Sequence, residues 1–209
     1  MVLNRVLRSE ESIARNVCVE PTNASKSTLR ATLLASREAQ VGQPGQAAKN
    51  EALAKRLLEM LARHSVRCVG FYWPVAAEFD ARDALTRWLA EDASRTAALP
   101  VVVERHAPMA FHAWRADAPM KEGRYRIPVP AEEQVVVPEL LLIPCVGFDS
   151  DRYRLGYGGG YYDRTLAAWP DAKRPTTIGI AFETGKCGAL PREAHDMPLD
   201  AIVTESAVY

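Results

Sequence analysis

The stretch Leu140–Arg164, which reads LLLIPCVGFDSDRYRLGYGGGYYDR, says most about the fold of this chain. It opens with Leu140–Pro144, a short run without charged or hydrogen-bonding side chains, as is typical of a strand covered on both faces of a sheet. Glycines then gather in a short segment: Gly156, Gly158, Gly159 and Gly160. A helical pattern begins near Tyr161. A buried strand, a glycine-rich turn and a helix in this order predict an α/β fold with its ligand site at the carboxyl ends of the strands.

Outward from this stretch, helical patterns alternate with short β-like runs. Helices are predicted over Lys26–Gln40, Gln46–His64 and Tyr161–Trp169, and after Asp80, which can cap a helix that buries Leu85, Trp88 and Leu89. Strands are predicted over Val66–Trp73, Pro100–Val103, Met109–Trp114, Leu140–Pro144, Thr176–Phe182 and Ala201–Thr204. A loop is predicted over Pro119–Pro138. This alternation predicts a three-layer α/β/α sandwich with a mainly parallel or mixed sheet.

The composition is that of one globular domain. The chain has 209 residues, of which 48% are hydrophobic and 25% are charged. We expect residues 26–209 to form a single domain and residues 1–25 to be a poorly ordered extension. Arginines in this extension are typical of an organelle transit peptide, but three acidic residues argue against one: Glu10, Glu11 and Glu20.

Charge and cysteine usage exclude several classes of protein. The 26 basic residues balance 26 acidic ones, so nothing global indicates a nucleic acid or an anionic membrane as partner. No apolar run approaches the ~18 residues of a membrane span. The cysteines are too widely spaced for a structural zinc site and fit a reducing compartment: Cys18, Cys68, Cys145 and Cys187. We therefore expect a cytoplasmic monomer that acts on small molecules, without a nucleic-acid or membrane partner.

The glycine segment has the chemical groups of a phosphate site. Glycines let the backbone approach a ligand closely, and their N–H groups, with the helix start near Tyr161, can form an anion cradle. Arg152 and Arg154 add permanent positive charge, which suits phosphate. Asp149 and Asp163 flank the segment, and carboxylates beside phosphate commonly hold Mg²⁺. The spacing matches neither a P-loop nor a dinucleotide fingerprint, so on these residues alone a tight turn without a ligand is an equal alternative.

The string RLGYGGGYYDR, after an apolar strand and GFD, resembles the signature of the 5-formyltetrahydrofolate cyclo-ligase family. Further motifs that resemble this family are Lys-x-x-Leu-Arg at Lys26–Arg30, FYWPVAAEFD with Glu78, Ile-Pro-x-Pro at Ile127–Pro130, and His-Asp-x-x-x-Asp with His195, Asp196 and Asp200. Together the motifs extend from about Lys26 to Tyr209.

The resemblance implies an enzyme that uses ATP to convert 5-formyltetrahydrofolate to 5,10-methenyltetrahydrofolate, with release of ADP and phosphate, through a phosphorylated formyl oxygen. It implies catalytic roles for Lys26 and Arg154, and Mg²⁺ held by Asp163 and Asp196, with Asp149 as a candidate third ligand. ATP would be bound by Lys26, Arg30, Arg154, Gly156, Tyr157, Gly158, Gly159, Gly160, Tyr161 and Tyr162. Folate would be bound by Glu78, Trp73, Tyr157 and Tyr161.

The basic residues and Glu78 also have interpretations without a ligand. Lys26, Arg30 and Arg37 fall within a roughly 40° wedge of one helix, so they could contact phosphate or a glutamate tail. Such a stripe is more often a solvated basic face. Glu78 could accept hydrogen bonds from an aminopyrimidine ring, or it could be an ordinary acid on a surface loop.

We expect some of the aromatic residues to lie in the site and others in the core. Among Phe71, Tyr72 and Trp73, we expect one to stack on the pterin and two to be packing residues. Of Tyr161 and Tyr162, we expect one to line the folate pocket and the other to pack inward.

The chain departs from the family pattern in the glycine segment, around the Ile-Pro motif and at Thr184–Gly188. Some members carry a basic residue where Tyr157 and Gly159 stand, and Arg126 and Val129 are unusual around the Ile-Pro motif. Three alternatives therefore stay open: a relative that binds without turnover, another phosphometabolite enzyme such as a sugar-phosphate isomerase on a similar scaffold, and an interaction module.

Overall fold

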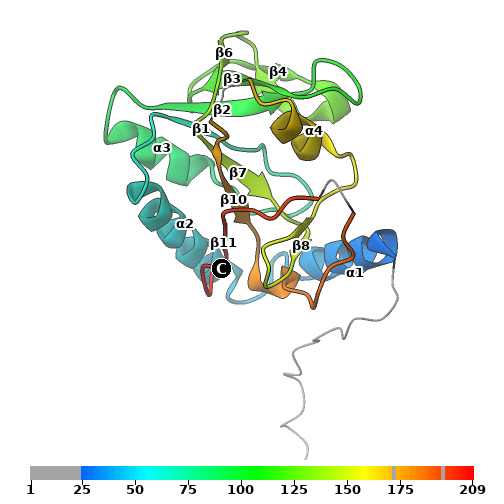
Figure 1. Ribbon diagram of the computed structural model, residues 1–209. Helices are drawn as coiled ribbons and strands as arrows, with labels where there is room; N and C mark the ends of the chain where they lie inside the picture. The colour runs from blue at the N-terminus through cyan, green and yellow to red at the C-terminus, as the bar shows by residue number, and fades with distance from the viewer. Residues whose placement is uncertain (1–24, 171–172, 194–195) are drawn as a thin grey trace, which may run out of the picture.

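The computed structural model describes residues 25–170, 173–193 and 196–209 (Figure 1). Its central sheet has seven strands in the order β11-β10-β7-β1-β2-β3-β6. Their bounds are β1 Cys68–Gly70, β2 Thr96–Val101, β3 Ala110–Trp114, β6 Val135–Val136, β7 Leu140–Pro144, β10 Thr176–Ile180 and β11 Ala201–Val203. The strands from β11 to β2 run parallel, and β3 and β6 continue the sheet antiparallel. The predicted mixed, mainly parallel sheet is confirmed.

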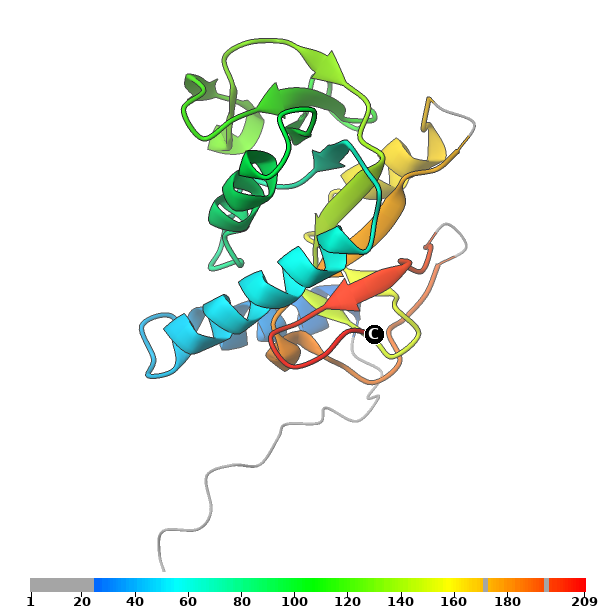
Figure 2. The same cartoon turned by 90° about the vertical axis from the view of Figure 1, so that its left-hand side faces the viewer.

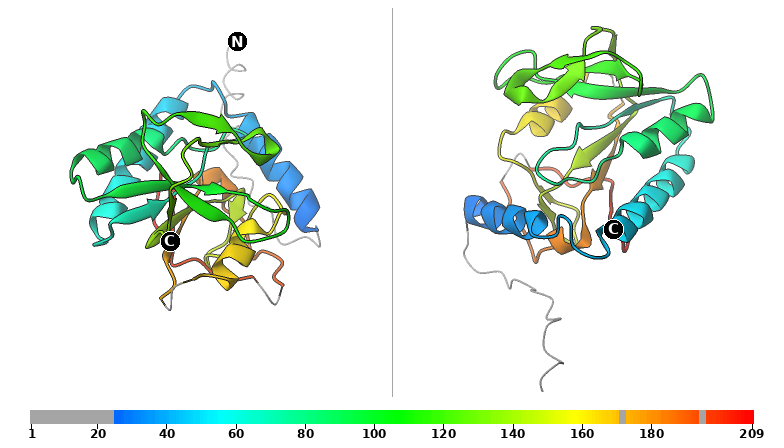
Figure 3. Two further views of the ribbon diagram at one scale, coloured as in Figure 1. Left: turned by 90° about the horizontal axis from the view of Figure 1, so that it is seen from above. Right: turned by 180° about the vertical axis from the view of Figure 1, so that it is seen from behind.

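The described residues form four α-helices: α1 Lys26–Glu38, α2 Gln46–Ala62, α3 Arg82–Ala90 and α4 Tyr161–Ala167. Helices α2 and α3 lie on one side of the sheet and α4 on the other, which gives the predicted three layers (Figures 1 and 3). Helix α1 lies apart from α2 and α3, near β8 at one end of the molecule (Figures 1 and 3). No helix in the described ranges is long and apolar enough to cross a membrane.

Strand β7 shows why the sequence around it is so apolar. Leu140 and Leu142 belong to the core that α2 and α3 cover, whereas Leu141 and Ile143 belong to the core on the other face, together with Leu166 of α4. These four β7 side chains are fully buried. Because both faces of this central strand are covered, the period-two alternation of a half-exposed strand is absent. Figure 2 shows β7 between the helical layers.

The remaining elements are small hairpins and turns. They are β4 Met120–Glu122 paired with β5 Pro128–Pro130, β8 Gly147–Phe148 paired with β9 Arg154–Leu155, and the 3₁₀ turns Arg124–Arg126 and Glu183–Gly185. The prediction of a plain loop over Pro119–Pro138 is therefore wrong, because β4, β5 and β6 all begin within it. Prolines are tolerated in a strand that lies at an edge, as both strands of a two-stranded hairpin do.

Other boundaries differ from the predicted ones. Strand β2 begins at Thr96, not at Pro100, because residues 96–98 pair with β1. Asp80 accepts the backbone N–H of Arg82 at 3.0 Å, but the N-cap residue of α3 is Ala81. Leu85 and Trp88 are buried as predicted. The predicted N-terminal extension lies, apart from its last residue, outside the described residues and stays a prediction, as does the single domain over residues 26–209.

Candidate active site

The glycine segment lies where the parallel strands end. Strand β7 leads through Cys145 and the β8–β9 hairpin into residues 156–160 and then into α4. Gly158 and Gly160 have positive φ, 89° and 62°, which glycine adopts without strain. Helix α1 supplies side chains to this region from far away in the sequence, and the turn after β1 supplies Glu78.

The basic stripe of α1 faces the protein. Arg30 Nε donates a hydrogen bond to the carbonyl of Gly156 at 2.6 Å, and a Cβ added to Gly158 would lie 3.3 Å from Arg30 Cζ. Arg37 is buried and its Nη2 donates to the carbonyl of Cys145. The interpretation of this stripe as a solvated face is therefore wrong. Because Arg37 is buried, its guanidinium holds the backbone at Cys145 and is not placed to contact a phosphate or a glutamate tail, as helical spacing had suggested.

Lys26 and Arg154 are each paired with a predicted metal ligand. Lys26 Nζ lies 2.7 Å from Asp196 Oδ2 and 2.9 Å from Glu193 Oε1. Arg154 Nη2 donates to Asp163 Oδ1 at 2.5 Å, and the Arg154 side chain is 8% exposed. Two predicted phosphate-binding cations and two predicted Mg²⁺ carboxylates thus form two ion pairs.

The donor set fits Mg²⁺ bound together with a nucleotide. No group of three or more metal-binding side chains of the usual types occurs among the described residues. Mg²⁺ rarely needs such a cage, since it keeps several waters and takes one or two carboxylates plus phosphate oxygens. Asp163 and Asp196 are the carboxylates that would serve this purpose, and each is paired with a cation in this structure.

Glu78 is presented by a strained turn. Ala76 and Ala77, immediately before it, have left-handed φ values of 46° and 57°, which are uncommon outside glycine. The Glu78 carboxylate accepts hydrogen bonds from the Val75 N–H and from the Tyr157 hydroxyl, both at 2.9 Å. Its side chain is 3% exposed, so Glu78 is not an ordinary surface acid. Burial raises the pKa of Glu78, against the opposing effects of these hydrogen bonds and of Arg37.

The two adjacent tyrosines of α4 point to different surroundings. The Tyr161 hydroxyl lies 2.6 Å from that of Tyr125, and the Arg164 guanidinium sits 4.9 Å from the Tyr161 ring centre. The Tyr162 hydroxyl is buried and has no hydrogen-bond partner within the described ranges, and burial, followed by the charge of Glu78, raises its pKa. Tyr162 is therefore the residue that packs inward, as one of the two was predicted to do. Tyr125 has a left-handed φ of 62°, and its position beside the glycine segment was not predicted from sequence.

The aromatic run after β1 divides as predicted. Phe71 and Tyr72 are buried core residues. Trp73 is only partly buried, and the Arg82 guanidinium covers one face of its ring at 4.3 Å. This leaves Trp73 as the aromatic residue of the run that could contact a ligand.

Asp149 has a structural role, which argues against its suggested role as a third metal ligand. Its Oδ1 accepts the N–H groups of Asp151 and Tyr153, both at 3.0 Å. Its Oδ2 accepts the N–H of Leu190 at 3.1 Å and Nη2 of Arg192 at 3.2 Å. The carboxylate is buried, and both of its oxygens are used to tie the turn after β8 to residues 190–192.

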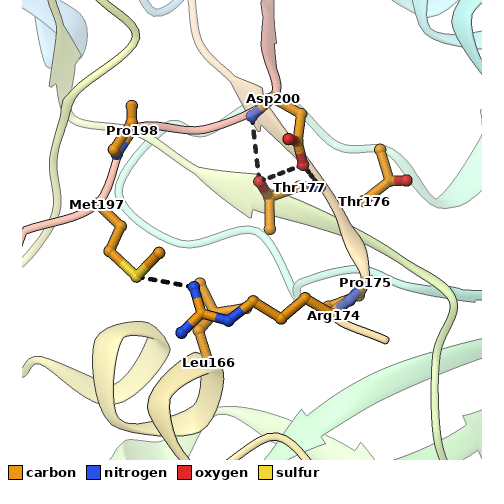
Figure 4. A pocket seen from close by; sticks show the side chains of 8 residues that line it. All are labelled: Leu166, Arg174, Pro175, Thr176, Thr177, Met197, Pro198 and Asp200. Carbon is orange, nitrogen blue, oxygen red and sulfur yellow. Dashed lines mark hydrogen bonds between the residues drawn. The ribbon is translucent and has the colours of Figure 1, made fainter. Parts of the chain in front are cut away.

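Asp200, the last residue of the His-Asp-x-x-x-Asp motif, is also structural. It accepts hydrogen bonds from the N–H and hydroxyl of Thr177 at 2.7 and 2.9 Å, which joins the starts of β10 and β11 (Figure 4). It lines a pocket of about 240 Å³ with Arg174 and Met197. This pocket lies at the amino ends of these strands and not at the carboxyl ends, where the glycine segment lies. His195 lies outside the described residues.

Comparison with known proteins identifies this arrangement. A profile of the 5-formyltetrahydrofolate cyclo-ligase family matches residues 22–205. The chain belongs to this family. The cyclo-ligase of Haemophilus influenzae is 28% identical over 157 residues, which cover 71% of this chain and 81% of that one. The cyclo-ligase of Mycolicibacterium smegmatis is 29% identical over 195 residues, 86% of this chain and 93% of that one.

Solved structures of the family agree. The 5,10-methenyltetrahydrofolate synthetase of Aquifex aeolicus superposes with a TM-score of 0.71 at 27% identity, over 88% of this chain and 91% of that one. The synthetase of Mycoplasma pneumoniae also gives 0.71, at 25% identity, over 87% and 99%. As a member of this family, the protein is an enzyme that converts 5-formyltetrahydrofolate to 5,10-methenyltetrahydrofolate.

Proposed function

We propose that the cyclisation consumes ATP and proceeds through a phosphorylated formyl oxygen. The observation that supports this most is the pairing of Lys26 with Asp196 and of Arg154 with Asp163 beside the glycine segment. Cations, backbone N–H groups and carboxylates placed together are what a nucleotide phosphate and its metal ion require.

The chemistry explains why ATP is needed. The formyl group on N5 is an amide, and its oxygen is a poor leaving group. Attack of this oxygen on the γ-phosphorus of ATP breaks the bond to ADP and converts the oxygen into part of a phosphate ester. N10 then attacks the formyl carbon. The C–O bond breaks, phosphate leaves with the former formyl oxygen, and the N10 proton is lost as the ring closes.

Each proposed residue has a task in this sequence. Lys26, Arg30 and Arg154 stabilise the negative charge that spreads over the transferring phosphoryl group, together with the N–H groups of residues 156–160 and the start of α4. Asp163 and Asp196 would hold Mg²⁺, which when bound neutralises phosphate oxygens. The enzyme needs no nucleophile of its own, since both attacking atoms belong to the substrate.

Glu78 and the aromatic residues would hold the folate. The buried carboxylate of Glu78 can accept paired hydrogen bonds from the aminopyrimidine edge of the pterin. Trp73, Tyr157 and Tyr161 would pack against the ring system. Alignment of the formyl oxygen with the γ-phosphate is the main contribution of this half of the site.

Methenyltetrahydrofolate has a near-ultraviolet absorbance that reports the reaction directly. We expect this absorbance to rise only when protein, 5-formyltetrahydrofolate, ATP and Mg²⁺ are all present. Arg30→Ala should lower kcat by about 10²–10³-fold, the usual effect of removing one group that stabilises developing charge. Arg63→Ala, which removes an exposed cation at the end of α2, is the control and should leave the rate unchanged. A rise in absorbance without ATP would contradict the proposal.

A further inference from the structure

The hydroxyl of Tyr157 lies between two buried charges. It accepts a hydrogen bond from Arg37 Nη1 at 3.2 Å and donates one to Glu78 Oε1 at 2.9 Å. Arg37 Nη1 and Glu78 Oε1 are themselves 3.9 Å apart, and the two side chains are 8% and 3% exposed. A hydroxyl can accept and donate at the same time, so it fits between a cation and an anion. The ring of Tyr157 stays partly exposed, with 42% of the residue accessible.

This hydrogen bond joins the two halves of the proposed site. Tyr157 stands inside the glycine segment, between Gly156, which Arg30 holds, and Gly158. Glu78 stands on the strained turn after β1, which would hold the pterin. The residues are 79 positions apart, so the contact exists only in the folded protein.

We propose that Tyr157 is a positioning residue that couples the binding of ATP to the binding of folate. The inference rests on the proposed function, since it assigns the phosphates to the glycine segment and the pterin to Glu78. A nucleotide that orders the glycine segment holds Tyr157 in place, and Tyr157 then holds the Glu78 carboxylate in the orientation that folate needs. The second ligand therefore meets a site that is already ordered. By thermodynamic linkage, folate strengthens nucleotide binding by the same factor.

The surroundings of position 157 favour a neutral hydroxyl over a cation. A cation at this position would lie beside the Arg37 guanidinium, which is buried and fixed by the carbonyl of Cys145. Like charges in a buried site repel strongly. A neutral hydroxyl avoids this repulsion and still bonds both partners. Phenylalanine would keep the ring but leave Arg37 and Glu78 without their bridging group.

The test is a set of binding measurements in which no turnover occurs. The affinity for a non-hydrolysable ATP analogue with Mg²⁺ is measured by calorimetry, first alone and then with saturating 5-formyltetrahydrofolate. The ratio of the two dissociation constants is the coupling factor. We expect a factor within the usual range of about 5–150 for the wild-type protein, and a factor near one for Tyr157→Phe. A residue that only supported the fold would lower both affinities and leave this ratio unchanged.

Tyr153→Phe is the matched control. Tyr153 lies on the turn before β9, outside the Arg37–Tyr157–Glu78 cluster, with its ring 4.0 Å from the Arg192 guanidinium. It should keep the full coupling factor. Thermal unfolding of both variants checks that they fold, which we expect because each substitution removes one oxygen and keeps a ring.

The outcomes separate this inference from the proposed function. Two results would overturn the inference alone. One is a wild-type protein that catalyses the reaction and binds both ligands without coupling. The other is a Tyr157→Phe protein that keeps the coupling factor. Wild-type protein that binds no ATP analogue would overturn the proposed function, and the inference with it. Loss of coupling in Tyr157→Phe but not in Tyr153→Phe supports the assignment.

Discussion

The ammonium group of Lys26 lies 2.7 Å from the carboxylate of Asp196, although 170 positions separate the two residues in the chain. The pair Arg154–Asp163 repeats this arrangement with residues that flank the glycine segment in the chain. In each pair a proposed phosphate ligand neutralises a proposed metal ligand. Nucleotide phosphates would take the place of the carboxylates beside the cations, and Mg²⁺ would take the place of the cations beside the carboxylates.

The Asp163 carboxylate should control the Mg²⁺ requirement. Asp163→Asn removes a charged ligand, so we expect the Mg²⁺ concentration at half-maximal rate to rise at least about tenfold. The rate is measured across a Mg²⁺ titration at saturating ATP. Asp151→Asn is the control, because that side chain is 67% exposed and lies on the neighbouring turn. An Asp163→Asn protein with an unchanged Mg²⁺ curve would exclude Asp163 as a ligand.

Unfolding must be measured alongside this titration. The Arg154 side chain is 8% exposed, and Asp163→Asn leaves its charge without a charged partner. Breaking a buried pair in this way costs about 3–5 kcal/mol in the most buried cases, and less here because Asp163 is 26% exposed. The titration is informative only under conditions where the variant is folded.

Gly158 and Gly156 offer a comparison within one loop. Gly158 has a φ of 89°, and a Cβ there would lie 3.3 Å from Arg30, whereas a Cβ at Gly156 meets nothing within 4 Å. We expect Gly158→Ala to lower the free energy of unfolding by about 1–3 kcal/mol, because alanine is strained in this conformation. Gly156→Ala should change it by less than about 0.5 kcal/mol. Urea denaturation measures both, and equal effects would contradict the described loop geometry.

As the pH is lowered, folate binding should be lost at a higher pH than it would be if Glu78 had the pKa of an ordinary glutamate. Burial raises the pKa of Glu78, so its carboxylate is protonated earlier as the pH falls, and a protonated group no longer accepts both pterin hydrogen bonds. Tyr157→Phe removes a hydrogen bond that lowers this pKa, so the acid limb of kcat/KM for folate should move to still higher pH. Tyr153→Phe should leave the limb in place. A shift in the opposite direction would contradict the Glu78 assignment.

The same pKa shift has a consequence for stability with the opposite dependence on pH. The folded-state pKa of Glu78 lies above its unfolded value of 4.5, so the native protein holds this proton more tightly. Glu78 therefore lowers stability at neutral pH, and this penalty builds up as the pH rises from 4.5 through the folded pKa. In Glu78→Gln the penalty is absent, which urea denaturation across that range can detect.

The centre of the sheet should be the most sensitive part of the core. Leu142 in β7 is fully buried beneath α2 and α3, so Leu142→Ala leaves a cavity and should cost about 2–5 kcal/mol of unfolding free energy. Val135→Ala in β6, at a residue that is 64% exposed, should change stability by less than about 0.5 kcal/mol. Chemical denaturation of the two variants tests the described layering, and similar losses would be inconsistent with it.

The sequence alone was enough for the architecture and for the family. The continuous apolar run Leu140–Pro144 indicates a strand that is buried on both faces. Such a pattern can be recognised from sequence because it consists of neighbouring residues. The motif RLGYGGGYYDR identified the family for the same reason, since its residues are consecutive. Element ends were less predictable: the start of β2 at Thr96 depends on pairing with β1, and that pairing is set by the sheet and not by local propensity.

Only the tertiary structure decided which candidate residues share one site and what each one contacts. Asp149 was as good a metal ligand as Asp163 by composition, but four donors from the folded chain surround Asp149, whereas Asp163 faces Arg154. The position of Arg37 on its helix stripe gave no sign that it is buried against Tyr157 and Glu78. The physical reason is that hydrogen bonding and burial depend on groups brought together from distant parts of the chain. The spacing of residues along the sequence does not show which of these groups will be in contact.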